Sequence, residues 1–172
     1  NHISSSTALI FPVKEICEKA QELGLITIVD GAHVPGHIDL DLADLNPDFY
    51  TGTLHKWMLA PKGSSFLYVK KEFQDDIDPL VVSWGYESVA PGESRFLDYH
   101  ELQGTRDVSA FLCTPKVVEF LEQNNWICLD SGTGHSQGKN FASNLPHPPG
   151  EDHDSVHTSR WAASRCCTAP PA

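Results

Sequence analysis

Apolar residues in the first part of the chain recur at two spacings, which predict alternating helices and strands. Between residues 12 and 23 they return every three or four positions, as on one face of a helix. The residues on this face are Val13, Ile16, Cys17, Ala20 and Leu23. Pro12 suits the first helical position and Gly24 the C-terminal cap, so the pattern predicts a helix that ends before Gly24.

Three short apolar runs predict strands at residues 25–29, 48–52 and 65–69. The first run has no polar alternation, which is typical of a strand buried on both faces. A short helical stretch, 42–45, lies in the link between the first two strands. A strand, a crossover and another strand imply a parallel sheet with right-handed connections. We therefore expect an α/β fold with a mostly parallel sheet flanked by helices.

The pattern is weaker after the third strand. It predicts one more strand at residues 80–84 and a loop at 85–92. A last helix is expected with Thr114 as its cap and Pro115 at its first position. Residues 107–113 should form a separate turn or helix, because Pro115 would break one continuous helix.

The chain changes character near its end, which suggests two segments, 1–126 and 127–172. The second is rich in Gly, Ser, Pro and His and has no periodicity, so we expect it to be disordered. It resembles out-of-frame or aberrant translation more than a selected tail. Its histidines are interpreted as incidental, because a metal site needs ordered ligands at fixed spacing.

Composition excludes several classes of protein. The net charge of −11 argues against a nucleic-acid-binding surface. No apolar run reaches the roughly 20 residues that cross a bilayer, and no signal region opens the chain, which predicts no membrane partner. The chain begins without Met and looks cut from a longer protein. Five cysteines without metal-binding spacing suit a reducing, cytoplasmic compartment.

Polar residues follow the first two predicted strands. Asp30 follows the first strand, and Thr53, His55 and Lys56 follow the second. Ligands of open parallel sheets bind beyond the carboxyl ends of the strands, so these four side chains are expected in one crevice. An equally open alternative is that Asp30 only caps the next turn, through the backbone that follows it.

Lys56 lies in an apolar run directly after His55. Desolvation and a neighbouring cation both favour the neutral amine, which is the form that makes a Schiff base with an aldehyde. Pyridoxal 5′-phosphate needs such a lysine, an acid beside its ring nitrogen and donors for its phosphate. Asp30, Thr53, His55 and Lys56 would supply all three. A rival interpretation is a metal-dependent hydrolase that uses Asp30, His33 and His55 as ligands.

Several motifs occur in one order along the chain. They are Val29-Asp30-Gly31-Ala32-His33, Thr53-Leu54-His55-Lys56-Trp57, Pro61-Lys62-Gly63 and Gln103-Gly104-Thr105-Arg106-Asp107. Together they resemble the class V aminotransferase family, within fold type I of the pyridoxal-phosphate enzymes, and above all its isopenicillin N epimerase-like branch. The resemblance covers residues 1 to about 126 and implies part of the large cofactor-binding domain.

The resemblance implies a role for each matching residue. Lys56 would form the Schiff base and Asp30 would pair with the ring nitrogen, while His33 takes the place of a glutamine that bonds the ring hydroxyl in desulfurase relatives. Thr53 and His55 would contact the phosphate. Thr105 would reach the phosphate of a neighbouring subunit, which implies a homodimer of the full-length parent. The resemblance leaves one departure, Ala8, which stands where a glycine is usual.

The implied substrate is an amino acid, and the implied chemistry is epimerase or aminotransferase chemistry. A cysteine desulfurase or C–S lyase is the alternative outcome. A desulfurase needs a thiol on a mobile loop, whereas Cys113 is expected to pack on a helix. Parts of the family's domain lie outside this chain, so we expect the isolated chain to be inactive. The remaining alternative is a non-catalytic truncated product that pairs with a full-length partner.

Overall fold

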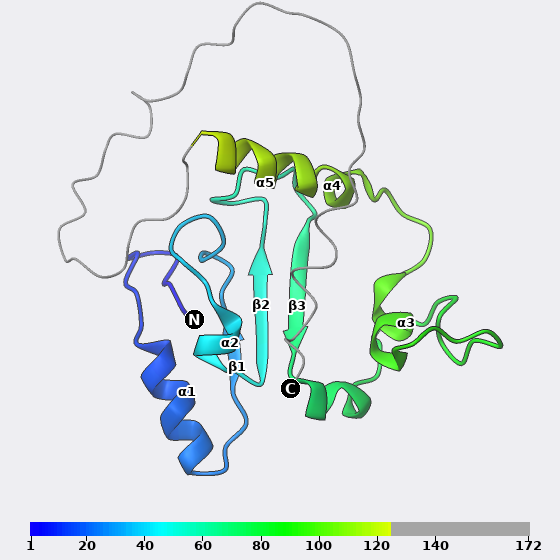
Figure 1. Cartoon of the computed structure of the whole chain (residues 1–172), viewed down its shortest axis with the longest axis horizontal. Coiled ribbons are helices and arrows are strands. Elements are labelled where there is room, and N and C mark those ends of the chain that lie inside the picture. The colour runs from blue at the N-terminus through cyan, green and yellow to red at the C-terminus, as the bar shows by residue number, and fades with distance from the viewer. Residues whose placement is uncertain (125–172) are drawn as a thin grey trace, which may run out of the picture.

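The structure, a computed structural model, describes residues 1–124 (Figure 1). In chain order its elements are α1 Val13–Glu22, β1 Ile28–Asp30, α2 Leu42–Leu45, β2 Phe49–Thr53, β3 Ser65–Val69, the 3₁₀ helix η1 Lys71–Asp76, α3 Arg95–Glu101, α4 Ser109–Leu112 and α5 Thr114–Gln123. The second predicted segment, with its expected disorder, lies outside the described residues.

The three strands form one sheet in the order β1-β2-β3. β1 and β2 are parallel, with Asp30 opposite Thr51, as the crossover pattern predicts. β2 and β3 are antiparallel, with Thr53 opposite Ser65. The α/β class is confirmed, but the described sheet is mixed rather than mostly parallel. The link 54–64 is too short for the crossover that a parallel third strand needs, so the chain turns straight back.

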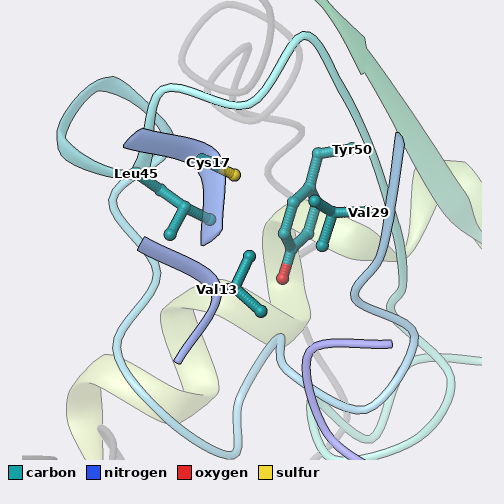
Figure 2. Close-up of a cluster of buried hydrophobic side chains, with 5 residues drawn as sticks. All are labelled: Val13, Cys17, Val29, Leu45 and Tyr50. Atoms are coloured by element: carbon teal, nitrogen blue, oxygen red, sulfur yellow. The ribbon is translucent and has the colours of Figure 1, made fainter. Parts of the chain in front are cut away.

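The main core lies between α1, α2 and the sheet. Its buried side chains, drawn in Figure 2, are Val13, Cys17, Val29, Leu45 and Tyr50. Tyr50 of β2 is fully buried at the centre. The predicted helix is confirmed as α1, although Ile16 and Leu23, expected on its inner face, are 51% and 63% exposed. The buried stripe is therefore narrower than the pattern suggests.

The first strand differs most from its prediction. It begins at Ile28 rather than Leu25, and the side chain of Ile28 is 80% exposed. The expectation of burial on both faces is wrong for the described residues, because Val29 is buried on one face while nothing described covers Ile28 on the other. At its end, the backbone N–H of His2 donates to the carbonyl of Asp30 at 2.8 Å.

The region after β3 lacks the strand that was expected there and contains two helices, η1 and α3, that were not predicted. Residues 80–84 form no strand, and Leu80 and Trp84 are 103% and 86% exposed, because no described strand lies beside them to pair with. Helix α3 has no counterpart among the predicted elements; the Ser94 hydroxyl caps it by accepting from the backbone of Leu97. Helices α4 and α5 are separate, as Pro115 predicts, although Thr114 lies inside α5 rather than before it.

Candidate active site

Two loops at the carboxyl ends of neighbouring strands make the candidate site. We call them the site loops: residues 31–38 after β1 and residues 54–60 after β2. Gly31 N donates to Thr51 O at 2.8 Å, which carries the strand pairing into the first loop. Ala60 N donates to Leu54 O at 3.0 Å and closes the second loop on itself. Lys56 is therefore held on a short closed loop rather than on a free connection.

The site loops pack directly on each other. Gly36 has a positive φ of 78°, and a Cβ there would lie 2.7 Å from the backbone nitrogen of Met58. Only glycine allows so close an approach in this conformation. The Thr53 hydroxyl adds a 2.8 Å hydrogen bond to the carbonyl of Ala32. These contacts bring the lysine of one loop to the histidine of the other.

Lys56 and His33 meet at the centre of the loop pair. Lys56 Nζ lies 3.0 Å from His33 Nε2, and both side chains are half-buried. Burial lowers the pKa of His33, and the nearby Lys56 and His37 lower it further, against an opposing effect of Asp30. His33 is thus favoured as a neutral imidazole. The crossing of the loops brings an amine and an imidazole 23 positions apart into contact.

Asp30 follows β1 as predicted, and it takes the turn-capping role. Its Oδ1 accepts from the backbone N–H of Ala32 at 2.9 Å, and its side chain is exposed. Its charge still acts on the site loops, since it raises the pKa of His33 and, after the larger effect of burial, that of Tyr50. Capping and an electrostatic role therefore coexist at this carboxylate.

Thr53 and His55 make hydrogen bonds within the protein. The single hydroxyl hydrogen of Thr53 is used by the carbonyl of Ala32. His55 Nδ1 donates to the carbonyl of Ser64 at 3.3 Å, and Nε2 has no described partner; Nε2 donates to an anion only when the ring is an imidazolium with both nitrogens protonated. Of the two residues expected to bind phosphate, His55 is the one with a spare group.

Thr105 and Cys113, for which the sequence gives expectations, lie outside the site loops, as does Arg106 of the last motif. Thr105 is exposed in the link between α3 and α4, and no described contact joins it to Lys56 or His33. Arg106 lies over the ring of Phe111, 5.1 Å from its centroid. Cys113 joins α4 to α5 but is exposed, so the expectation that it packs away from solvent is wrong.

The metal-dependent hydrolase finds no support in residues 1–124. No group of three His, Cys, Asp or Glu side chains there is placed to hold a metal ion. The proposed ligands are engaged elsewhere, His33 with Lys56 and His55 with the Ser64 carbonyl.

Among residues 1–124, none of the helices has the length and apolar character that a membrane span requires.

Two residues of the site loops have no role predicted from the sequence. Trp57 Nε1 donates to His33 Nδ1 at 3.4 Å, and its ring stacks on His37 with centroids 4.3 Å apart. The only sequence signal is that Trp57 directly follows Lys56. That spacing cannot show which residue of another loop the indole reaches.

The pattern of the family described as Aminotransferase class-V matches residues 1–129. The chain therefore belongs to the class V aminotransferase family. Enzymes of this family depend on pyridoxal 5′-phosphate. The groups at the carboxyl ends of β1 and β2 fit that cofactor chemically: Lys56 offers an amine for its aldehyde, His33 a ring nitrogen beside that amine, and Asp30 a carboxylate at the end of β1.

Curated relatives narrow the comparison. The isopenicillin N epimerase of Streptomyces clavuligerus is 42% identical over 130 residues, a match covering 70% of this chain and 33% of that protein. A probable chloroplastic L-cysteine desulfhydrase of Arabidopsis thaliana is 35% identical over 127 residues, covering 72% of this chain and 26% of that protein. The chain thus spans about a third or less of these relatives.

Solved structures show the same fold. The apo cysteine desulfurase of Thermococcus onnurineus NA1 matches with a TM-score of 0.61 and 25% identity, over 73% of this chain and 32% of that one. The cysteine desulfurase CsdA of Escherichia coli matches with a TM-score of 0.55 and 23% identity, over 70% of this chain and 31% of that one. The predicted fold, a partial large domain of this type, is confirmed.

Proposed function

We propose that this chain carries the lysine-bearing part of a pyridoxal-phosphate-dependent enzyme that acts on an amino acid in the manner of an isopenicillin N epimerase. The observation that carries the proposal is the 3.0 Å contact between Lys56 Nζ and His33 Nε2, at the edge where β1 and β2 end. The 42% identity to an isopenicillin N epimerase supports the choice of reaction.

The proposal gives a role to each of four candidate residues. Lys56 would hold the cofactor through its aldehyde, and its amine would move a proton at the substrate Cα. Asp30 would provide negative charge for the ring nitrogen, and His33 would contact the ring beside Lys56. His55, as an imidazolium, would donate from Nε2 to the phosphate. The cofactor itself supplies an electron sink for the charge that develops at Cα.

The outer parts of the site involve further proposals. Thr53 would join His55 at the phosphate, which requires its hydroxyl to give up the bond to Ala32. Thr105 is exposed, so it would be available to contact the phosphate bound in a second subunit. A homodimer of the whole protein would follow from that contact. The isolated chain, spanning a third of its epimerase relative, is still expected to turn over little.

A C–S lyase is the second candidate, because relatives named L-cysteine desulfhydrase match 72% of this chain at 35% identity. The two outcomes share every role above and differ only in the fate of the substrate after its Cα proton leaves. Assay of the whole protein separates them: an epimerase inverts Cα and keeps the substrate intact, whereas a desulfhydrase releases sulfide from cysteine.

Borohydride trapping tests the central role of Lys56. Pyridoxal 5′-phosphate is added to the purified chain, the lysine–cofactor bond is reduced, and modified peptides are mapped. Lys62 is a matched control, because it is exposed in the connection between Lys56 and β3. We expect Lys56 to be modified well above Lys62, and the Lys56→Ala chain to lose this excess. Equal modification of both lysines would reject the proposal and favour the alternative that the chain is a non-catalytic truncated protein.

A further inference from the structure

Three side chains of the site loops form a continuous line of hydrogen-bonding atoms. Trp57 Nε1 lies 3.4 Å from His33 Nδ1, and His33 Nε2 lies 3.0 Å from Lys56 Nζ. The two nitrogens of one imidazole therefore face two different partners. Which nitrogen carries the hydrogen decides what His33 can offer to each of them.

The indole favours one of the two tautomers because it can only donate, whereas Lys56 can donate as an ammonium or accept as an uncharged amine. An indole N–H has no acceptor capacity, so His33 Nδ1 must accept and carries no hydrogen. A neutral imidazole then keeps its single hydrogen on Nε2. Burial is the largest cause that lowers the pKa of His33, and it favours the neutral ring whatever the charge of Lys56.

We propose that Trp57 is a positioning residue that fixes His33 in the tautomer with hydrogen on Nε2, so that the imidazole presents a donor at the Lys56 side of the site. An ammonium group has donors only, whereas an uncharged amine has a lone pair that can accept. The line from Trp57 through His33 to Lys56 is therefore fully satisfied only when the amine is uncharged, the form that attacks an aldehyde.

The indole is held in place for this role. His37 stacks on it with centroids 4.3 Å apart and an interplanar angle of 27°. His37 Nδ1 in turn donates to the backbone carbonyl of His33 at 3.1 Å. Gly36 lets the backbone of residues 57 and 58 approach the first site loop closely. The ring of Trp57 is 40% exposed, so it is anchored through one face and its N–H.

The consequence of this tautomer for a bound cofactor rests on the proposed function. A donor on His33 Nε2 suits a ring oxygen that carries negative charge, because such an oxygen only accepts. The other tautomer would present a lone pair to that oxygen and repel it. Trp57 would then act on the cofactor through His33, without touching the cofactor.

Nitrogen-15 NMR of the histidine rings tests the tautomer in the full chain without cofactor. In the wild-type chain at pH 8 we expect His33 to be neutral, with hydrogen on Nε2. In Trp57→Phe, which keeps an aromatic ring at this position but loses the five-membered ring with its N–H donor, the population with hydrogen on Nδ1 should rise about threefold to tenfold, the equivalent of one neutral hydrogen bond. The control Trp84→Phe, which alters an indole that is 86% exposed, should leave His33 unchanged.

Two results would overturn the inference. One is a wild-type His33 with hydrogen on Nδ1 or on both nitrogens at pH 8. The other is an unchanged ratio in a Trp57→Phe chain whose backbone spectrum stays native. Should that variant fail to fold, the wild-type measurement still decides. The NMR measurement uses no cofactor, so its result is separate from that of the borohydride trapping. If His33 has the expected tautomer but trapping does not favour Lys56, only the proposed function is rejected. If trapping favours Lys56 but His33 has the other tautomer, only this inference is rejected.

Discussion

The two ends of the strand pair β1–β2 carry similar groups in contrasting states. At the amino end, the Asp48 carboxylate is 6% exposed and accepts from Thr27 N at 2.8 Å, Thr27 Oγ1 at 2.9 Å and Lys70 Nζ at 3.2 Å. Burial alone would raise the pKa of Asp48, but these donors together lower it. At the carboxyl end, Asp30 accepts one described side-chain hydrogen bond and is exposed. The Asp48 carboxylate, whose partners all lie inside the protein, stabilises the fold. The Asp30 carboxylate has acceptor positions left over, which a ligand can use.

Backbone strain separates the same two ends. Near the amino end, the left-handed position at the end of α2 is Asn46, with a φ of 48°, a conformation that asparagine tolerates. Near the carboxyl end, Ala8 and Leu59 adopt φ values of 54° and 63° without that tolerance. Strained residues persist where surrounding structure holds them, and they gather at functional sites. The carboxyl end is thus both less satisfied and more strained.

Removing Asp48 should give the largest loss of stability. Asp48→Ala leaves the Thr27 donors without their acceptor and leaves Lys70, whose side chain is 25% exposed, with only the longer 3.7 Å pair to the exposed Glu72 among its described ion pairs. We expect the free energy of unfolding to fall by about 3 kcal/mol, measured by urea denaturation. Asp44→Ala, which breaks an ion pair exposed on both sides, should produce no measurable change. Equal losses in the two variants would contradict a structural role for the amino end.

Separating the site loops should have the next largest effect. Gly36→Ala combines a positive φ with a Cβ 2.7 Å from Met58 N, and we expect a loss of about 2 kcal/mol in unfolding free energy. Gly24→Ala is the matched control, since its φ is 67° but nothing lies within 4 Å of the new Cβ; its loss should be about 1 kcal/mol. Gly36→Ala should also reduce the excess trapping at Lys56. Identical behaviour of both variants would show that the loops do not depend on close packing.

The sequence predicts well what depends on local pattern. The helical spacing of Val13 and Cys17 is realised in α1, and Lys56 and Asp30 do follow neighbouring strands. The apolar runs do not predict that β3 is antiparallel to β2, because they show which residues are buried and not how strands pair. The same limit explains the strand expected at residues 80–84, where apolar residues have no described partner.

The sequence predicts which residues belong to the candidate site but not which of them contact each other. Motif positions name Lys56 and His33, yet their 3.0 Å contact depends on how closely two loops approach at Gly36. The donor from Trp57 depends on the same crossing. Thr53, expected to be free for phosphate, bonds the Ala32 carbonyl, a partner that only the three-dimensional structure reveals.

Low pH should remove the stabilisation that the Asp48 carboxylate provides at the amino end of the strand pair. The lowered pKa of Asp48 means that the folded state favours its ionised form, so its stabilisation is present above the ordinary aspartate range, about pH 4, and is lost as the pH falls through the folded-state pKa. We expect Asp48→Asn to be about 1.5 kcal/mol less stable than wild type at pH 6, the worth of a charge-assisted hydrogen bond. The gap should close below pH 4 in urea titrations. A gap that is constant with pH would show that the charge of Asp48 contributes nothing.

Relieving strain at the carboxyl end should give the smallest effect, with the opposite sign. Ala8 is exposed and has a φ of 54°, so Ala8→Gly removes one methyl group and lets the turn adopt its conformation without steric cost. Glycine also gains freedom in the unfolded chain, which offsets part of that benefit, so we expect a net stabilisation of about 0.5 kcal/mol. Asn46→Gly, at a left-handed position that asparagine tolerates, should not stabilise. If urea denaturation shows Ala8→Gly to be destabilising, the methyl group has a packing role and the strain assigned to this end must be smaller than the dihedral angle suggests.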